Sequence, residues 1–388
     1  MRYIHCLNNI SKIGTDLLPE SYALTDDANA AAGILVRSAA MHDMEFSDEL
    51  LAIGRAGAGV NNIPLDRCAE QGIVVFNTPG ANANAVKELV LCALLLGSRG
   101  IVDGIGWCRE HDDDENIGKA AEKAKKAFAG REIMGKKLGV IGLGAIGAKV
   151  ANAAVDLGMD VCGYDPFVSV AAAWSLDANV HHITDLADIF RTCDYITIHV
   201  PAVAGTIGMV DETACAQMKE GAVLLNFSRD TLVDADAIAA ALESGKVSSY
   251  ITDFATPEVM KMPHTIVLPH LGASTAEAED NCAIMAVREL AGYIENGTIA
   301  NSVNYPACDM GPCPEGTGRI AILHEAADDA VERISAAFAD GTAHITGSAS
   351  GSRGANGYTL IALDHPADAA SIEQAKALAG VRRVRVIR

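Results

Sequence analysis

Short apolar runs alternate with amphipathic helical stretches along most of this chain. In the first hundred residues, runs at 33–36, 50–55 and 72–77 predict buried strands, and 83–96 is apolar along one helical face. Several of these strands end in small or polar residues, and in an open parallel sheet that edge is where ligands bind. The alternation predicts an α/β unit with a parallel, doubly wound sheet.

The same alternation resumes after residues 99–134, a stretch of acidic and Lys/Ala/Glu-rich runs. That stretch is expected to be a helical connection, either a solvated face or an arm that meets another subunit. A second parallel sheet is then expected, with strands at 138–141, 160–164, 195–200, 223–227, 251–254 and 265–268 and helices at 148–157, 187–192 and 235–244.

A third, smaller unit is expected at the end of the chain. A long helix at 276–295 crosses back to the first unit, and the Pro/Gly-rich segment 305–318 follows as a linker. The remaining residues predict the order β-α-β-β-α-β of a ferredoxin-like module, with strands at 319–323, 358–363 and 381–387 and helices at 327–338 and 371–379.

A glycine motif marks the second unit as dinucleotide-binding. Gly142, Gly144 and Gly147 follow the strand 138–141 at the spacing G-x-G-x-x-G and precede a helix. The first glycine permits a tight turn, the second lets a pyrophosphate approach the backbone, and the third lets helix and strand pack closely. Asp165 ends the next strand, 23 residues after Gly142, where a carboxylate takes the ribose hydroxyls and repels a 2′-phosphate. The pattern therefore predicts NAD as the cofactor rather than NADP.

The composition of the chain limits the kinds of binding partner that we expect. A formal net charge of −20 argues against binding to nucleic acid or to an anionic membrane. The 10 cysteines are scattered without metal-ligand spacing and are expected to be reduced, and no metal site is expected. Residues 1–9 lack the apolar run of a signal peptide, and no stretch approaches about 18 uninterrupted apolar residues. A cytoplasmic protein is expected.

Polar side chains follow three predicted strands of the second unit: Arg229, the pair Asp253 and Glu258, and His270. The planar fork of an arginine binds a carboxylate bidentately. A histidine exchanges protons near neutral pH, and a carboxylate beside it can hold it in place. These are the groups that hydride transfer from a 2-hydroxy acid requires.

The motifs stand in the order found in the D-isomer-specific 2-hydroxyacid dehydrogenases. The chain resembles this family from residue 1 to about 305, through segments 36–38, 54–60, 77–80, 142–147, 226–229 and 269–275. The resemblance implies two Rossmann-like domains: a substrate-binding domain of residues 1–98 and 276–305, and an NAD-binding domain of residues 99–275. Residues 319–388 form the additional small module.

By this resemblance, Arg229 is the substrate arginine and His270 is the acid/base catalyst. Glu258 stands where the family's histidine-pairing carboxylate is expected, and Asp253 is the alternative partner. The family usually reads Glu-Pro there, whereas this chain reads Pro257-Glu258. NAD contacts are implied for Thr78, Gly142, Gly144, Ala145, Ile146, Gly147, Asp165, Pro201, Thr206, Phe227, Ser228, Asp253, Gly272 and Ala273.

Two arginines indicate a phosphorylated 2-hydroxy acid as the substrate. Arg37 and Arg55 resemble the phosphate-holding residues of family members whose substrate carries a phosphate. The turn 57–59 offers backbone N–H groups to a carboxylate. Substrate contacts are implied for Arg37, Ser38, Arg55, Gly57, Ala58, Gly59 and Asn84. The alternatives are another substrate, such as hydroxypyruvate, glyoxylate or lactate, or a non-catalytic NAD(H)-binding protein like the corepressors that share the fold.

Residues 319–388 resemble an ACT module, a small amino-acid-sensing domain. Effector-binding modules of this kind usually carry an Asn and a Pro-Gly turn after the first strand, where this chain reads His324-Glu325-Ala326-Ala327-Asp328. An effector site and a pairing surface for assembly therefore both stay open. The family resemblance also implies a homodimer or a higher homo-oligomer.

Overall fold

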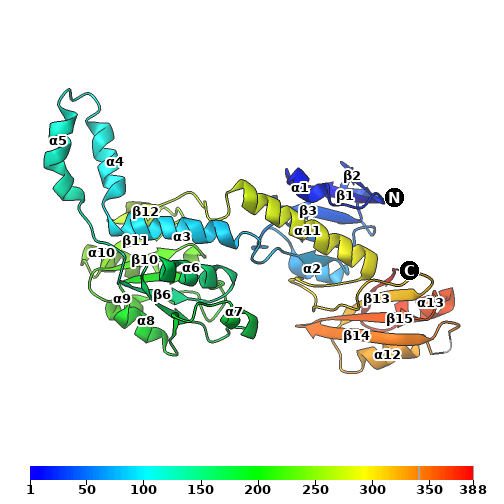
Figure 1. Cartoon of the computed structure of the whole chain (residues 1–388). Coiled ribbons are helices and arrows are strands. Elements are labelled where there is room, and N and C mark those ends of the chain that lie inside the picture. The colour runs from blue at the N-terminus through cyan, green and yellow to red at the C-terminus, as the bar shows by residue number, and fades with distance from the viewer. Residues whose placement is uncertain (340, 388) are drawn as a thin grey trace. The chain divides into compact units, whose positions relative to one another are not determined.

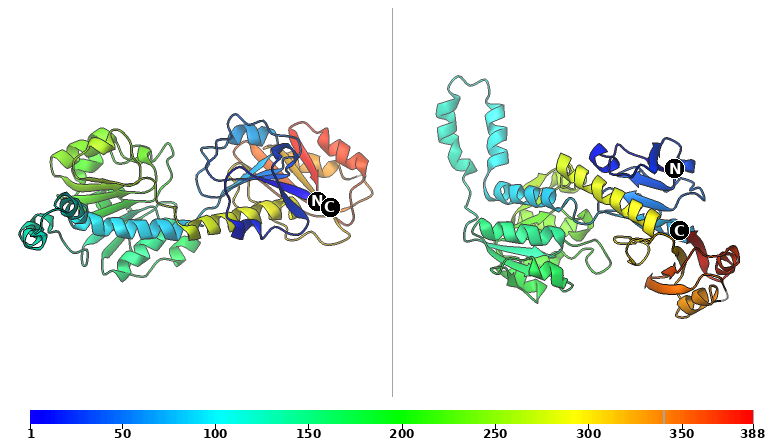
Figure 2. Two further views of the ribbon diagram at one scale, coloured as in Figure 1. Left: turned by 90° about the horizontal axis from the view of Figure 1, so that it is seen from above. Right: turned by 45° about the vertical axis from the view of Figure 1, so that its right-hand side comes forward.

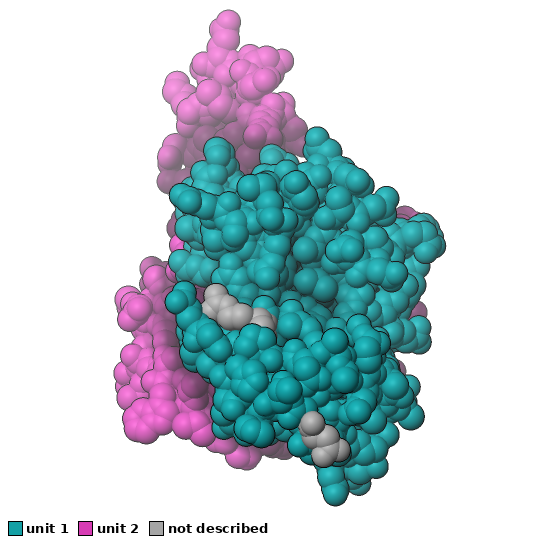
Figure 3. Space-filling model, turned by 90° about the vertical axis from the view of Figure 1, so that its right-hand side faces the viewer, with its two compact units in different colours: residues 1–82, 276–388 teal, residues 83–275 magenta. Residues whose placement is uncertain are grey.

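The computed structural model describes residues 1–339 and 341–387, and it divides into two compact units (Figure 3). Unit 1 contains residues 1–82 together with the chain from 276 onward, and unit 2 contains residues 83–275. We expected the first boundary near residue 98. The helix α3 (Ala83–Ser98) instead packs on helix α6 (Ala145–Asp156) and belongs to unit 2.

Unit 1 is built on a parallel sheet with the strand order β2-β1-β3-β4-β5. Its strands are β1 (Arg2–Cys6), β2 (Tyr22–Thr25), β3 (Gly33–Val36), β4 (Ala52–Arg55) and β5 (Val74–Phe76), and its short helices are α1 (Lys12–Thr15) and α2 (Leu65–Glu70). The predicted long helix is α11 (Ala276–Asn296), and it packs on α1 and on β3, β4 and β5. Close approach explains two glycines, because a Cβ on Gly14 would lie 2.6 Å from Ala283 and one on Gly33 would lie 2.6 Å from Leu290.

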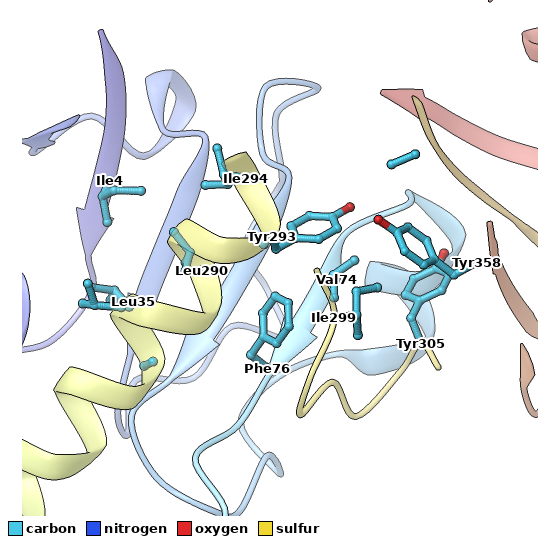
Figure 4. Packing of buried hydrophobic residues seen from close by; sticks show 14 of the residues in the cluster. Ile4, Leu35, Val74, Phe76, Leu290, Tyr293, Ile294, Ile299, Tyr305 and Tyr358 are labelled. Carbon is cyan, nitrogen blue, oxygen red and sulfur yellow. The ribbon is translucent and has the colours of Figure 1, made fainter. Parts of the chain in front are cut away.

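The C-terminal module has the predicted β-α-β-β-α-β order and an antiparallel sheet in the order β14-β15-β13-β16. Its elements are β13 (Gly318–Glu325), α12 (Ala330–Ala336), β14 (Ile345–Arg353), β15 (Asn356–Leu363), α13 (Ala369–Lys376) and β16 (Val381–Val386). Its core is continuous with that of the parallel sheet, as Figure 4 shows: Tyr293 of α11 contacts Phe76, with ring centroids 5.8 Å apart, and Tyr358, with centroids 6.4 Å apart. The module is therefore an integral part of unit 1.

Unit 2 is built on a parallel sheet with the order β12-β11-β10-β9-β6-β7-β8. The strands are β6 (Lys137–Ile141), β7 (Asp160–Tyr164), β8 (His181–His182), β9 (Tyr195–Ile198), β10 (Ala222–Asn226), β11 (Val247–Thr252) and β12 (Thr265–Val267). Besides α3 and α6, its helices include α7 (Val170–Trp174), α8 (Leu186–Thr192), α9 (Glu212–Gln217) and α10 (Ala235–Glu243). Two doubly wound parallel sheets and an α+β module were the predicted fold, and this prediction is confirmed.

A helical hairpin projects from the rest of unit 2 (Figures 1 and 2). It consists of α4 (Ile101–Glu110) and α5 (Ile117–Ala124), and neither helix has a buried residue. Ile101, Val102 and Ile105 leave 37–49% of their surfaces exposed. Within the described chain, no single helix is both long and apolar enough to cross a membrane, although α3 and α4, joined by a 70° bend, pass that test as a pair.

Candidate active site

The glycine loop lies between β6 and α6, and each glycine meets a different need. Gly142 adopts φ 90°, and a Cβ there would lie 2.5 Å from the carbonyl oxygen of His199. A Cβ on Gly147 would collide with the carbonyl of Gly142, whereas one on Gly144 would meet nothing within 4 Å. The loop is therefore tightly packed on the protein side and open where Gly144, Ala145 and the start of α6 face outward. This cradle fits a pyrophosphate at a helix N-terminus.

Asp165 follows the end of β7 and is built into the same loop. Its Oδ2 accepts a hydrogen bond from the backbone N–H of Leu143 at 2.9 Å, and its Oδ1 accepts one from Phe167 at 2.8 Å. These bonds fix the carboxylate beside the glycine turn, where a ribose would lie. The residues present therefore fit NAD.

Two further loops at this edge of the sheet are held by side-chain hydrogen bonds. Thr206 Oγ1 donates to the carbonyl of Pro201 at 2.5 Å and accepts from the N–H of Val203 at 3.0 Å. Ser228 Oγ donates to the carbonyl of Ile198 at 2.7 Å, next to the buried Phe227. Ile146, on the first turn of α6, and Ala273, in the loop after β12, are half-buried at the same edge. Their predicted roles as NAD contacts remain predictions.

The catalytic candidates of unit 2 follow three neighbouring strands. Arg229 follows β10, Asp253 follows β11 and His270 follows β12, and these strands are adjacent in the sheet. Because carboxyl ends of parallel strands share one edge, the three residues stand at the same edge of the sheet. Electrostatics agrees, since the charges of both His270 and Arg229 act on the carboxylate of Asp253.

Asp253 is the anchor of this group. Burial raises the pKa of its carboxyl, while the N–H of Gly272 and the charges of His270 and Arg229 act in the opposite direction. Its Oδ2 accepts from Gly272 at 3.0 Å, and its carbonyl accepts from the N–H of His270 at 3.0 Å. Its Oδ1 is buried with no hydrogen-bond partner in the described chain. A buried acceptor without a donor is costly, so this atom is poised for a donor from an imidazole or a ligand.

His270 is held in an unusual backbone conformation. Its φ of 49° lies in the left-handed region, where few non-glycine residues stay without a compensating constraint. The constraint is the backbone bond to Asp253, and the imidazole also packs edge-on against Phe254 with ring centroids 5.1 Å apart. The ring itself remains solvent-accessible, as a proton-exchanging group must be.

No hydrogen bond or ion pair joins Glu258 to the imidazole among the described atoms, and the predicted pairing stays a prediction. Glu258 is exposed just before a 3₁₀ turn, and bonds from its own backbone N–H and from Thr256, with nearby Lys261, lower the pKa of its carboxyl. The physical reason is the short loop between β11 and β12, which curls Glu258 into its own turn. Asp253, the alternative, is the carboxylate next to His270.

In unit 1, the turn after β4 brings an arginine over a glycine. Arg55 is the last residue of β4, and a Cβ on Gly57, which has φ 144°, would overlap the Arg55 guanidinium. The carbonyl of Gly57 accepts from the N–H of Thr78 at 3.0 Å, and that of Ala58 accepts from Asn77 Nδ2 at 2.7 Å. The N–H of Gly57 donates to the carbonyl of Arg55 at 2.8 Å, so the anion binding predicted for this turn would use the N–H groups of Ala58 and Gly59. Thr78 Oγ1 is buried without a hydrogen-bond partner among the described atoms.

The loop after β3 is fixed by one side chain. Asn8 Oδ1 accepts from the backbone N–H groups of Arg37, Ser38 and Ala39 at 2.8, 3.0 and 3.1 Å. The side chain of Arg37 forms an ion pair with Glu279 on the first turn of α11, with 2.6 Å between Nη1 and Oε1. Sequence reasoning missed both partners, because residues 8 and 279 lie far from residue 37 in sequence and belong to no motif.

Asn84 and His199 have local roles in unit 2. Asn84 Nδ2 donates to Glu88 Oε1 at 2.8 Å on the first turn of α3, and its implied contact with the substrate stays a prediction. His199 forms a 2.9 Å bond between its Nε2 and Thr197 Oγ1, and burial lowers its pKa to about 3. A histidine kept neutral in this way supports the loop beside Gly142 and is not a second base.

Comparison with known proteins defines the class. Residues 92–272 match the model of the NAD-binding domain of the D-isomer-specific 2-hydroxyacid dehydrogenases. The chain is 30% identical over 356 residues to the D-3-phosphoglycerate dehydrogenase of Haemophilus influenzae, covering 89% of this chain and 83% of that protein. The protein belongs to the D-isomer-specific 2-hydroxyacid dehydrogenase family. It is an NAD-dependent oxidoreductase.

Other similar proteins support this assignment. The D-3-phosphoglycerate dehydrogenase of Archaeoglobus fulgidus is 32% identical over 286 residues, although the match covers 71% of this chain and only 52% of that protein. Among solved structures, an NAD⁺-bound 3-phosphoglycerate dehydrogenase of Entamoeba histolytica superimposes with a TM-score of 0.62 at 24% identity, covering 78% of this chain and 98% of that one. A glyoxylate reductase from Paecilomyes thermophila gives a TM-score of 0.66 at 22% identity, with the same coverage. At these identities the structures establish the fold.

Proposed function

We propose that this chain oxidises D-3-phosphoglycerate at C2 to 3-phosphooxypyruvate with NAD, the first step of the phosphorylated route to L-serine. The observation that carries the proposal is that Arg229, Asp253 and His270 follow three adjacent strands of one parallel sheet. An arginine, a histidine and a carboxylate are the side chains that oxidation of a 2-hydroxy acid requires. The names of the relatives given above indicate D-3-phosphoglycerate as the substrate.

Each residue has a separate task. Arg229 holds the substrate carboxylate through its planar fork. His270 takes the proton from the C2 hydroxyl, and Asp253 orients the loop that presents the imidazole. The chemistry that NAD would supply when bound is acceptance of the hydride from C2. The glycine loop and Asp165 would hold that cofactor at the start of α6.

Unit 1 supplies the features that recognise phosphate. Arg37 and Arg55 stand at the carboxyl ends of the adjacent strands β3 and β4, and the Arg55 guanidinium lies beside Gly57. Two guanidinium groups at one sheet edge suit a phosphate dianion, whereas substrates without a phosphate need neither. The proposal therefore assigns phosphate binding to Arg37 and Arg55.

The deciding experiment is a rate assay at 340 nm with D-3-phosphoglycerate and NAD, repeated with NADP and with glycerate, lactate and 2-hydroxyglutarate. We expect NADH formation from the phosphorylated substrate and much slower turnover with NADP. The double variant Arg37→Ala, Arg55→Ala should raise the KM for D-3-phosphoglycerate far more than that for glycerate. Equal increases in KM for both substrates would contradict the assignment of phosphate binding to Arg37 and Arg55. Tight NADH binding without turnover on any substrate would favour a corepressor-like role.

We also propose that the protein works in the cytoplasm as a homodimer formed through the α4–α5 hairpin. The hairpin has no buried residue within its own chain and exposes the apolar side chains Ile101, Val102 and Ile105. A second copy would cover this surface. Ile105→Glu should convert the dimer to a monomer in light scattering, while a dimer that persists unchanged would place the interface elsewhere.

A further inference from the structure

A basic cavity lies between the C-terminal module and the rest of unit 1. It has a volume of about 700 Å³. One wall comes from the loop before β4 and the end of α2, and the other comes from α13 and β16. The lining residues are Phe46, Ser47, Asp48, Gln71, Lys376, Val381, Arg382, Arg383 and Val384. We call this cavity the basic pocket.

The basic pocket carries an excess of positive charge in a strongly acidic protein. The chain holds 50 acidic and 30 Lys and Arg residues, yet Lys376, Arg382 and Arg383 face a single acidic side chain, Asp48, in this lining. Among the described residues, no carboxylate oxygen lies within 4 Å of a nitrogen of Arg382 or Arg383, and Lys376 pairs only with Glu373 of its own helix. Unneutralised, partly buried cations are costly unless an anion compensates them.

Both arginines are positioned in advance by backbone carbonyls and an amide. Arg383 donates from Nη1 to the carbonyl of Leu50 at 2.5 Å and from Nη2 to that of Asp48 at 3.4 Å. Arg382 donates from Nη1 to Asn356 Oδ1 at 2.5 Å and to the carbonyl of Ala69 at 3.2 Å. These neutral acceptors hold the guanidinium groups without cancelling their charge, which is the arrangement of an anion site.

A second, much smaller cavity lies within the module. The cavity around His324, Arg333 and Leu378 has a volume of about 10 Å³, enough for roughly one water molecule. His324 lines it, with Nδ1 bonded to the carbonyl of Glu325 at 2.8 Å and Nε2 to Thr359 Oγ1 at 3.0 Å. A small regulatory molecule would therefore bind at the border of the module and not inside this cavity.

We propose that the basic pocket binds a small multivalent anion that carries phosphate or carboxylate groups, and that its occupancy affects the substrate-binding turn. The connection is short, because the carbonyls of Asp48 and Leu50 that hold Arg383 precede β4, and β4 ends in Arg55. An anion that draws Arg383 toward itself weakens those bonds and shifts the start of β4.

Calorimetric titration of the full-length protein with inorganic pyrophosphate and, separately, with citrate tests the binding claim. Saturating NADH is present in both titrations to block the cofactor site. We expect saturable binding of at least one of the two anions, and the one that binds identifies the preferred chemistry. Lys376→Gln and Arg382→Gln should each weaken the binding about tenfold or more, since each removes a charge-assisted bond to the anion. Asp48→Asn should strengthen it, because a like charge is removed.

Lys12→Gln is the matched control. Lys12 is an exposed lysine of unit 1 that forms an ion pair within its own helix region, as Lys376 does, and it lies outside the pocket lining. Absence of binding by both anions, or equal affinity in the Lys376, Lys12 and Asp48 variants, would overturn the proposal. The calorimetric titrations measure anion binding alone and do not depend on catalysis.

A second experiment tests whether the bound anion affects substrate binding, and it rests on the proposed function. The bound anion should change the KM for D-3-phosphoglycerate in the wild type and not in Lys376→Gln. Binding without any change in KM would refute the coupling and leave the binding site standing, whereas a lack of turnover would count against the proposed function instead.

Discussion

Arg37 and Glu279 form an ion pair with 2.6 Å between Nη1 and Oε1. Arg37 is a proposed phosphate ligand, and the carboxylate therefore occupies a guanidinium that a substrate phosphate needs. The side chains keep 36% and 44% of their surfaces exposed, so the pair is accessible to a competing anion. Surface pairs of this kind are weak, and a phosphate dianion can displace the carboxylate.

Neutralising Glu279 should therefore improve recognition of the phosphorylated substrate. We expect Glu279→Gln to lower the KM for D-3-phosphoglycerate about two- to fivefold, as the loss of an ion pair of about 0.5–1 kcal/mol predicts, and to leave the KM for glycerate unchanged. Asp280→Asn is the control, because Asp280 is the next residue of α11 and accepts from Ser11 instead of an arginine. Steady-state kinetics with both substrates tests this prediction. An equal decrease in the KM for glycerate would contradict the assignment of Arg37 to the phosphate.

A second prediction separates the two carboxylates near the catalytic histidine. Asp253→Asn should lower kcat by about tenfold or more, because Asp253 anchors the loop at Gly272 and its charge acts on His270. Glu258→Gln should change kcat by less than about twofold, because Glu258 is exposed in its own turn. A large loss of kcat in Glu258→Gln with normal turnover in Asp253→Asn would reverse the assignment.

A third prediction concerns stability and pH. Burial raises the pKa of Glu289 from 4.5 to about 7, and Asn301 Nδ2 donates to its Oε1 at 2.5 Å. The folded state therefore favours the protonated carboxyl, and its stabilising contribution is full below pH 4.5 and lost as the pH rises to about 7. Relative to the wild type, the thermal midpoint of Glu289→Gln should thus rise between about pH 5 and about pH 8.

The matched control for that experiment is Glu277→Gln, an exposed glutamate on the first turn of the same helix. Its difference from the wild type should stay nearly constant over the same range. A Glu289→Gln difference that is flat or falls with rising pH would contradict a buried, protonated carboxyl at this position.

Much of the fold could be predicted because its signals are local. Strands β3 and β7 and the start of α11 fall where the apolar runs placed them. The strand β14 was missed, because its sequence Ile-Thr-Gly-Ser-Ala-Ser-Gly-Ser-Arg lacks the apolar alternation of a strand and is held by pairing with β15. Tertiary pairing determined that element, and no local pattern reports it.

The residues of the candidate site likewise include some with a local sequence signal and some without one. Gly142, Asp165 and His270 could be predicted because each follows a strand within a recognisable motif. The spacing leaves both Asp253 and Glu258 as candidate partners of His270, because their different surroundings depend on the path of the loop and on no local pattern. Arg383 of β16 gave no signal either, since its acceptors are the backbone carbonyls of Leu50 and Asp48, more than 300 positions away in the sequence.

The central claim is that His270 takes the hydroxyl proton of a 2-hydroxy acid held by Arg229. The most direct measurement is the rate of NADH formation at 340 nm from D-3-phosphoglycerate by the wild type and by His270→Ala, with NADH affinity measured in parallel. We predict a loss of kcat of about a hundredfold or more with NADH affinity unchanged. Near-normal turnover in His270→Ala would contradict the account.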